Sequence, residues 1–266
     1  MELKDKVVVV TGGAGGIGSA LCRRFAAEGA RAVVVSDLDG EGATKVAADL
    51  PEGVGIAIAA NVAVEADVAN LVERTESQCG PVDLFCANAG VAIGGGPEAT
   101  DEDWSLAWQV NLMAHVYAAR ALLPGWLTRG EGYFLSTASA AGLLTNLGAA
   151  PYAVTKHGAV ALAEWMAISY GDAGVKVSCL CPQGVRTNML LGGAIDDAVG
   201  VAVVTAAGPV IEPDDVADAV VAGLRDERFL ILTHPEVADY EVRRATERDR
   251  WLGGMRKLLA RLQSGK

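Results

Sequence analysis

The stretch that decides the fold is Val7–Gly18, which reads VVVVTGGAGGIG and runs directly into a helix-like segment from Ser19. The valines and Thr11 predict a short buried strand, and the glycines predict a tight turn whose backbone N–H groups can approach a phosphate. The positive end of the helix that follows favours the same anion. Because this loop lies between a first strand and a first helix, it predicts a dinucleotide site in preference to a plain turn.

The rest of the chain repeats the alternation of short apolar segments with longer helix-like ones. We predict strands over Val7–Thr11, Ala32–Ser36, Gly55–Ala60, Leu84–Ala87, Gly132–Ser136, Lys176–Cys181 and Phe229–Leu232. We predict helices over Ser19–Glu28, Glu41–Leu50, Glu65–Cys79, Trp104–Leu123, Tyr152–Tyr170 and Pro213–Leu224. Wholly apolar strands separated by helices indicate a parallel sheet that is covered on both faces. The pattern therefore predicts an α/β fold, a single doubly wound Rossmann-type domain over residues 1–266 with about seven strands.

Composition narrows the classes of function. The chain of 266 residues has a net charge of −11, which speaks against a protein that binds nucleic acid. The longest uncharged stretch, Ala198–Ile211, is too short to span a bilayer, and no separate signal segment precedes Val7, so we expect no membrane partner. The five cysteines lack zinc-ligand spacing. We therefore expect no metal site and a reduced, cytoplasmic location.

Asp37 follows the second predicted strand. A carboxylate at this position can accept hydrogen bonds from the adenosine ribose and would repel a 2′-phosphate. No Arg or Lys occurs in the glycine loop or at Ser36–Asp39 to bind such a phosphate. The alternative is that Asp37 only forms a turn together with Asp39 and Gly40. We favour the ribose role, which predicts NAD as the cofactor and not NADP.

Tyr152 and Lys156 lie four residues apart on a predicted helix and therefore share one face. A free tyrosine has a pKa near 10, too high for a base at neutral pH. A neighbouring cation favours the phenolate, so we predict that Lys156 lowers the pKa of the Tyr152 phenol toward the working pH.

Together these features make the chain resemble the short-chain dehydrogenase/reductase family in its compact form. The resemblance extends from about Lys4 to Thr187, and more loosely to Leu232. The matching motifs, in chain order, are Thr11, Gly12, Gly16 and Gly18 of the glycine loop, then Asn88-Ala89-Gly90, Asn111, Ser139, the pair Tyr152 and Lys156, and the stretch Pro182-Gln183-Gly184-Val185-Arg186-Thr187. Six motifs in the family's order make an accidental resemblance very improbable.

The resemblance implies hydride transfer between a nicotinamide and the carbinol carbon of an alcohol, or the reverse reaction on a carbonyl. It implies that Tyr152 exchanges the hydroxyl proton and that Lys156 assists it and binds the nicotinamide ribose. Ser139 would hydrogen-bond the substrate oxygen, and Asn111 would hold a water molecule in the proton path. The implied cofactor-binding residues are Gly12, Gly16, Ile17, Gly18, Asp37, Asn61, Val62, Asn88, Ala89, Gly90, Tyr152, Lys156, Pro182, Val185 and Thr187.

Four positions depart from the family's pattern. Asn61 stands where an Asp usually faces the adenine, and Ala87 replaces the first Asn of an Asn-Asn pair. Gln183 replaces a Gly beside the nicotinamide, and Ser136 replaces an Asn before the catalytic Ser. None of these changes removes a chemical group that the mechanism requires.

The predicted substrate side is apolar. Residues 188–212 combine Gly pairs with small apolar residues, which suits a lid that excludes water. We expect Leu143, Leu144 and Leu147 to line the same pocket. Because no Arg or Lys occurs in these segments, we predict an uncharged, apolar secondary alcohol or ketone as the substrate.

Two segments suggest contacts beyond the catalytic fold. The stretch Tyr152–Tyr170 is apolar nearly all round, so we expect a homodimer or homotetramer in preference to a helix covered by its own chain. Trp104 and Trp108 are predicted to pack in the core, although they suit such an interface as well. The tail, residues 233–266, predicts one or two helices that either cross a subunit boundary or help to close a pocket.

One function of a different class remains, a non-catalytic NAD sensor or scaffold on the same fold. A binding module has no need of Asn111, Ser139, Tyr152 and Lys156 together. The presence of all four favours the enzyme.

Overall fold

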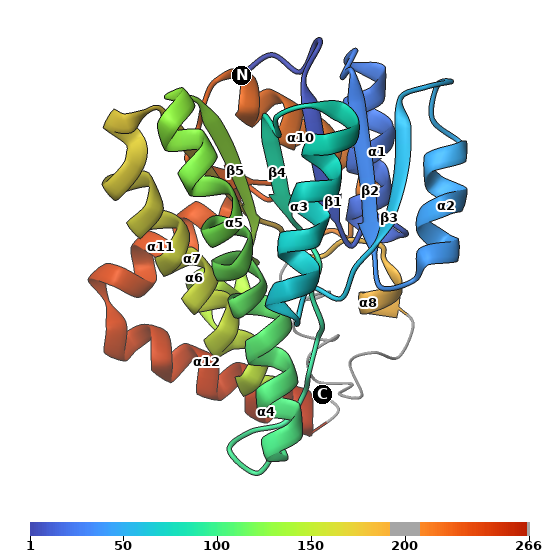
Figure 1. Cartoon of the computed structure of the whole chain (residues 1–266). Coiled ribbons are helices and arrows are strands. Elements are labelled where there is room, and N and C mark those ends of the chain that lie inside the picture. The colour runs from blue at the N-terminus through green and yellow to red at the C-terminus, as the bar shows by residue number, and fades with distance from the viewer. Residues whose placement is uncertain (192–207, 265–266) are drawn as a thin grey trace.

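A computed structural model describes residues 1–191 and 208–264 and contains one seven-stranded sheet (Figure 1). The strands are β1 (Val7–Thr11), β2 (Ala32–Asp37), β3 (Gly55–Ala59), β4 (Leu84–Ala87), β5 (Gly132–Thr137), β6 (Val175–Cys181) and β7 (Leu230–Leu232). Every neighbouring pair is parallel, and the order across the sheet is β3-β2-β1-β4-β5-β6-β7. The predicted doubly wound α/β fold is confirmed.

Helices cover both faces of this sheet. The longer helices are α1 (Gly16–Ala27), α2 (Gly40–Ala48), α3 (Glu65–Cys79), α4 (Asp101–Trp108), α5 (Ala114–Arg129), α7 (Ala150–Tyr170), α10 (Pro213–Arg225), α11 (Glu236–Thr246) and α12 (Arg248–Gln263). The short ones are α6 (Ala141–Leu144), α8 (Asn188–Leu191), the π-helical turn η1 (Gln109–Met113) and the 3-10 turn η2 (Gly171–Ala173).

The alternation of side chains along β1 explains the two layers. Val7 and Val9 pack into a core shared with α3, α5 and α7, while Val8 and Val10 pack into a second core shared with α1, α2 and α10. Because both faces are covered, each residue of the strand is buried, which is why the strand is apolar throughout.

The strand order reverses between β1 and β4, which are neighbours in the sheet. The loops that leave these two strands therefore diverge and open a crevice at the carboxyl edge of the sheet, where ligands of such folds bind. The glycine loop leaves β1 at this edge, and Asn88–Gly90 leaves β4 beside it.

The helix predicted over Trp104–Leu123 is the element that differs most from expectation. It extends from Asp101 to Arg129 and is interrupted by the π-helical turn η1. The prediction that Trp104 and Trp108 pack in the core is also wrong for Trp108, whose side chain is 44% exposed.

The helix α7 is not fully covered by the described part of the chain. Trp165 is 57% exposed and Ile168 is 83% exposed, although both are large and apolar. The described part of the chain therefore leaves this face of α7 exposed, and the choice between a subunit interface and a cover from this chain stays a prediction.

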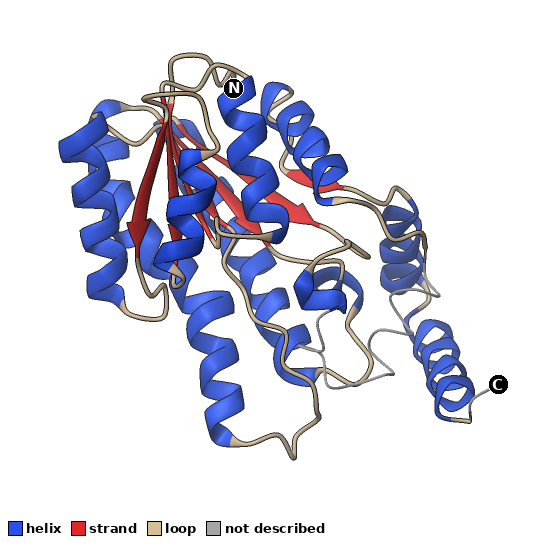
Figure 2. Ribbon diagram, turned by 90° about the vertical axis from the view of Figure 1, so that its right-hand side faces the viewer, coloured by secondary structure: helices blue, strands red, loops and turns tan. Residues whose placement is uncertain are grey.

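The two last helices lie apart from the sheet, and the chain ends on α12 (Figure 2). Val237 of α11 is fully buried in the core, whereas α12 has no buried residue. Within the part of the chain that the structure describes, no helix meets the length and hydropathy needed to cross a membrane.

Candidate active site

The glycine loop packs closely against its neighbours at the crevice, and at two of its glycines there is no room for a side chain. Gly12 has a φ of 65°, and a Cβ there would lie 2.9 Å from Cα of Ala89. A Cβ on Gly18 would lie 1.9 Å from the carbonyl oxygen of Gly12. The start of α1 therefore packs directly on the loop and leaves its first N–H groups facing the crevice.

Thr11 and Asn88 join the two loops at the reversal of strand order. Thr11 Oγ1 accepts hydrogen bonds from the backbone N–H groups of Asn88 at 3.0 Å and Ala89 at 3.1 Å. Asn88 Nδ2 donates to the carbonyl oxygen of Thr11 at 3.0 Å. These bonds hold the two walls of the crevice together.

Asp37 ends β2 and lies at the cavity wall, so its position is compatible with the ribose role, which stays a prediction. Its carboxylate accepts hydrogen bonds from the N–H groups of Ala14 and Asp39, each at 3.0 Å, so it does form a turn at the end of β2. It also lines the cavity described below, beside the glycine loop. The carboxylate can accept further hydrogen bonds from ribose hydroxyls there.

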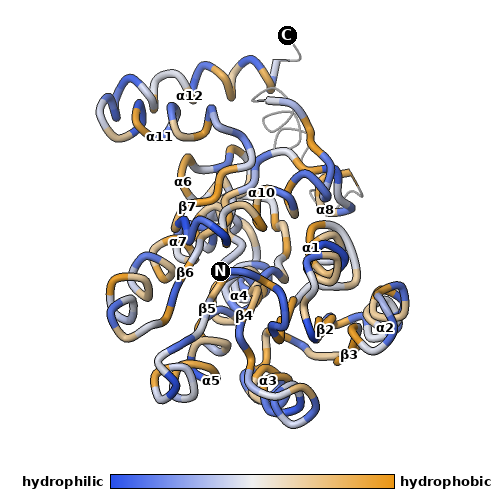
Figure 3. Tube along the Cα trace, turned by 90° about the horizontal axis from the view of Figure 1, so that it is seen from above, coloured by the Kyte–Doolittle hydropathy of each residue, from blue (hydrophilic) through white to orange (hydrophobic). Residues whose placement is uncertain are grey.

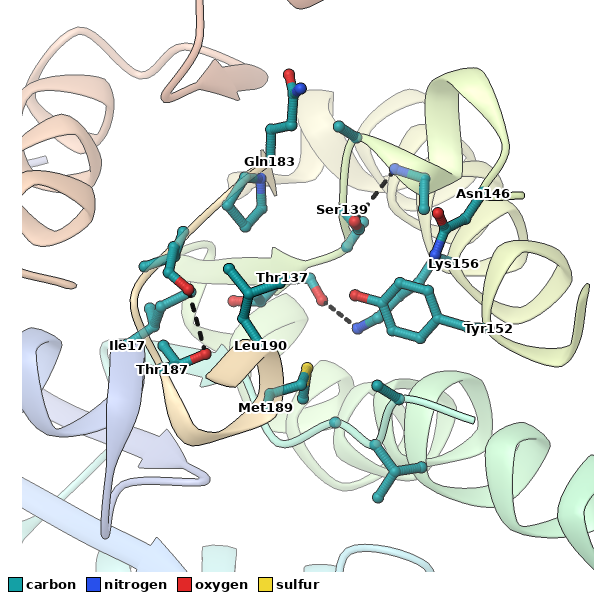
Figure 4. A pocket seen from close by; sticks show the side chains of 18 of the residues that line it. Ile17, Thr137, Ser139, Asn146, Tyr152, Lys156, Gln183, Thr187, Met189 and Leu190 are labelled. Atoms are coloured by element: carbon teal, nitrogen blue, oxygen red, sulfur yellow. Dashed lines mark hydrogen bonds between the residues drawn. The ribbon is translucent and has the colours of Figure 1, made fainter. Parts of the chain in front are cut away.

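Ser139, Tyr152 and Lys156 meet at the other end of the crevice (Figure 4). Ser139 follows β5, and Tyr152 and Lys156 lie one turn apart on α7. Lys156 Nζ donates to the carbonyl oxygen of Thr137 at 3.0 Å and lies 5.7 Å from the centre of the Tyr152 ring. The predicted proton-transfer pair therefore shares one face of a helix, with a serine hydroxyl beside it.

The ionisation of this pair differs from the prediction. Burial lowers the pKa of Lys156 to about 8. Burial raises the pKa of the Tyr152 phenol, an effect that its hydrogen bond with Ser139 opposes. The expected lowering of the tyrosine pKa is therefore not found in the polypeptide alone, where removal from water outweighs the contribution of Ser139.

Asn111 lies in the π-helical turn and is 0% exposed. Its Oδ1 accepts from the N–H of Val91 at 2.9 Å, and its Nδ2 donates to the Val91 carbonyl at 2.9 Å and to Thr155 Oγ1 at 3.2 Å. The amide thus ties η1 to the loop after β4. Its role in holding a water molecule stays a prediction.

A cavity of about 1220 Å³ contains these groups. Of the predicted cofactor-binding residues, its walls include Gly12, Gly16, Ile17, Asp37, Asn61, Val62, Asn88, Ala89, Gly90, Tyr152, Lys156, Pro182, Val185 and Thr187. Gly18 and Asn111 lie behind this surface. Gln183, one of the departures from the family's pattern, also lines the cavity. Its Oε1 is buried and has no hydrogen-bond partner among the described residues.

The substrate side differs in detail from the prediction. Leu144 lines the cavity, but Leu143 is buried in the core and Leu147 is not part of the wall. Of the predicted lid, Asn188, Met189 and Leu190 line the cavity, and residues 192–207 lie outside the described residues. Leu106 and Val110, near the end of α4, complete this side and were not predicted.

The tail supplies the part of the wall that sequence reasoning left open. Its lining residues are Tyr240, Arg243, Glu247, Arg250, Trp251, Gly254, Met255 and Leu258. Arg243 and Arg250 add basic side chains to the wall, and they come from the tail and not from the two segments predicted to line the substrate side. The helical spacing of Trp251, Met255 and Leu258 in the sequence indicated an amphipathic helix with one apolar side.

The residues present fit a nicotinamide dinucleotide. The loop without side chains at Gly12 and Gly18 can receive a pyrophosphate, and Asp37 can receive the adenosine ribose. Asn61 uses Oδ1 to accept from the N–H of Ala63 at 3.0 Å and lines the cavity at the adenine end. Lys156 lies at the opposite end, where it can bind the second ribose.

Comparison with known proteins agrees with this geometry. The sequence profile described as short chain dehydrogenase matches residues 6–192. Meso-2,3-butanediol dehydrogenase from Serratia marcescens is 36% identical over 230 residues, which cover 85% of this chain and 90% of that protein. The 1-deoxy-11-beta-hydroxypentalenate dehydrogenase of Streptomyces exfoliatus is 35% identical over 245 residues, covering 89% and 86%.

Solved structures agree as well. A short chain dehydrogenase/reductase from Burkholderia phymatum in complex with NAD superposes with a TM-score of 0.84 at 28% identity, covering 94% of this chain and 96% of that one. The 3-ketoacyl-(acyl-carrier-protein) reductase of Brucella melitensis complexed with NADH gives a TM-score of 0.78 at 28% identity, covering 86% and 97%. In sequence and in fold, the chain belongs to the short-chain dehydrogenase family of nicotinamide-dependent oxidoreductases.

Proposed function

We propose that the protein transfers a hydride between NAD and an apolar secondary alcohol or its ketone, with Tyr152 as the acid and base. The observation that carries the proposal is the meeting of Ser139, Tyr152 and Lys156 at one end of the cavity that begins at the glycine loop. The relatives named as dehydrogenases of meso-2,3-butanediol and of 1-deoxy-11-beta-hydroxypentalenate support a hydroxyl-bearing substrate.

The residues divide the chemistry between them. NAD, when bound, supplies the carbon that accepts the hydride from the carbinol carbon of the alcohol. Tyr152 takes the hydroxyl proton as the carbonyl forms, and Ser139 donates a hydrogen bond to the same substrate oxygen. Lys156, fixed by its bond to the Thr137 carbonyl, stabilises the phenolate that this transfer requires. In the reduction direction the same proton returns to the carbonyl oxygen.

We propose NAD as the preferred dinucleotide because of Asp37. A carboxylate held by the N–H groups of Ala14 and Asp39 accepts hydrogen bonds from ribose hydroxyls and repels a 2′-phosphate. The neighbouring structures named as complexes with NAD and NADH support this choice.

We propose that the protein is a homo-oligomer of the cytoplasm. The exposed Trp165 and Ile168 of α7 support an apolar interface with a second copy. The five cysteines, all free and buried, suit a reducing compartment.

The test is turnover of a panel of linear and cyclic secondary alcohols with NAD and with NADP, followed by the absorbance of the reduced nicotinamide. The proposal expects turnover with NAD, weak turnover with NADP, and loss of activity in Tyr152→Phe with NAD binding retained. Bound NAD without turnover across the panel would instead favour the non-catalytic sensor.

A further inference from the structure

The helix α12 has an apolar side that the described chain leaves uncovered. Trp251, Met255, Leu258 and Leu262 recur at helical spacing and form one stripe along it, while its other side is rich in Arg and Lys. Figure 3 shows the resulting alternation of hydrophobic and hydrophilic residues along α12. No residue of the helix is buried, and its main packing partner is α11. Within residues 1–191 and 208–264, the apolar side of this amphipathic helix is thus only partly covered.

The same side faces the cavity that contains the catalytic residues. Trp251, Met255 and Leu258 line the space of about 1220 Å³ that Ser139 and Tyr152 also line. Other apolar members of the wall are Leu106, Val110, Leu144, Met189 and Leu190. Burial of apolar surface from both partners stabilises a complex, so a hydrophobic molecule held here gains affinity from the tail as well as from the body of the fold.

The tail is joined to the body of the fold by the packing of α11 on α6, by the buried Val237 and by a hydrogen bond to the catalytic helix. Arg244 Nη2 donates to Nε2 of His157 at 3.3 Å, and His157 Nδ1 donates to the carbonyl oxygen of Ala153 at 2.8 Å. His157 directly follows Lys156 on α7. The rings of Tyr240 and Trp251 lie 6.2 Å apart and join α11 to α12. The apolar stripe is therefore held at a defined place relative to the proton-transfer pair.

We propose that α12 forms the distal half of the substrate site and binds the body of a large lipophilic alcohol or ketone. The inference rests on the proposed hydride transfer and adds the substrate class, a molecule whose apolar part extends well beyond the reacting carbon. The stripe belongs to the same cavity as Tyr152, which favours substrate over a second copy of the chain as its occupant. The exposed apolar face for a second copy lies elsewhere, on α7 around Ile168.

The experiment compares residues of α12 that line the cavity with neighbouring residues of α12 that do not. Trp251 and Leu258 line the cavity, whereas Leu252, 49% exposed, and Leu259 are not part of its wall. Trp251→Ala and Leu258→Ser are therefore the test variants, and Leu252→Ala and Leu259→Ser are their matched controls. Because none of these side chains is buried, all four variants are expected to fold.

The measurement is kcat/KM with NAD for the 2-alkanols from 2-butanol to 2-dodecanol. In the wild type, kcat/KM should rise with chain length. Each test variant should lose about tenfold with 2-dodecanol, the equivalent of one large apolar side chain removed from the contact, and less than about twofold with 2-butanol. The control variants should follow the wild type. Equal losses with both alcohols, or equal losses in controls and test variants, would overturn the proposal.

Two further measurements distinguish this inference from a failure of the hydride-transfer proposal and from a subunit interface. Calorimetric titration with 2-dodecanone requires no turnover, and it should show weaker binding in Leu258→Ser than in Leu259→Ser. Binding with this difference but without turnover of any alcohol would reject the hydride-transfer proposal and keep the apolar site. Sedimentation should give the same mass for all variants, and dissociation in Leu258→Ser would assign the stripe to a subunit interface and overturn the inference.

Discussion

Lys156 is 3% exposed, and the burial of its ammonium group carries a cost in stability. Its pKa falls to about 8 in the folded protein from an ordinary value of 10.5, so the unfolded chain binds the proton more tightly. Lys156→Met should abolish turnover. It should also raise the free energy of unfolding at neutral pH by roughly 3 kcal/mol, from which the contribution of the lost hydrogen bond to Thr137 is subtracted. Urea unfolding of both proteins measures the difference.

The lowered pKa of Lys156 also makes the stability of the protein depend on pH in a defined range. Below a pH of about 8 the free-energy cost of burying the charged Lys156 is fully present, and this cost declines as the pH rises toward 10.5. The stability advantage of Lys156→Met over the wild type should therefore shrink across this window. A constant advantage from pH 7 to pH 10 would contradict the assignment.

The phenol of Tyr152 starts from a raised pKa, because burial disfavours the phenolate. Alcohol oxidation requires the deprotonated form, so kcat/KM for oxidation should rise with pH through the neutral and mildly alkaline range. Tyr152→Phe should lower kcat/KM by about 10²–10⁴-fold and remove that rise. The pH profile of both proteins, with Ser139→Ala for comparison, is the measurement. A rise that persists in the phenylalanine variant would place the base elsewhere.

Asp37 connects cofactor choice to the shape of the glycine loop. Asp37→Ala removes an acceptor from the N–H of Ala14 as well as the proposed ribose contact. We expect weaker NAD binding, a smaller preference for NAD over NADP, and a loss of about 1 kcal/mol in unfolding free energy. Titration with each dinucleotide and urea unfolding test the two effects separately, and unchanged preference would reject the ribose role.

The connection between β1 and α1 offers a matched pair of glycines. A Cβ at Gly18 would lie 1.9 Å from the Gly12 carbonyl oxygen, whereas a Cβ at Gly15 meets no atom within 4 Å. Gly18→Ala should lower the free energy of unfolding by about 2 kcal/mol or more, as expected for overpacking, and should weaken dinucleotide binding. Gly15→Ala should leave stability unchanged. Thermal unfolding of both variants measures the contrast.

The strands were predictable to within about one residue at each end because each is a short run of β-branched and apolar residues bounded by turn residues. The same holds for helices with a clear apolar side, such as α3. The π-helical turn at Gln109–Met113 was not predictable from the sequence. Its Asn111 bonds to the backbone of Val91, which lies outside the helix. Local periodicity contains no information about such a contact.

The site was predictable where chemistry dictates residue type, as at Asp37 and the Tyr152–Lys156 pair. Two things were missed for a physical reason. The ionisation of Tyr152 depends on how deeply the finished fold removes it from water, and the choice of the cavity over a subunit boundary for the tail depends on the packing of α11 against α6 and α7. Both are properties of the assembled molecule and not of any motif.

At the level of the assembled protein, the exposed side of α7 should control association. Trp165 and Ile168 are 57% and 83% exposed, and an apolar side chain left in water favours contact with a second copy. Ile168→Glu should lower the mass measured by sedimentation to that of a smaller species. Val242→Glu, at an exposed valine of α11, is the control and should leave the mass unchanged. A wild-type monomer would contradict the proposed oligomer.

The bond between Arg244 and His157 has a consequence for how such a protein can diversify. The motifs that serve the dinucleotide and the proton transfer end at Thr187, whereas the distal wall begins only at Tyr240, beyond the last strand. The last two helices follow all of these motifs in the chain, and α12 packs mainly on α11 and not on the catalytic core. Recombination, drift or laboratory grafting of the last helices can therefore create new substrate repertoires while the inherited chemistry is left intact.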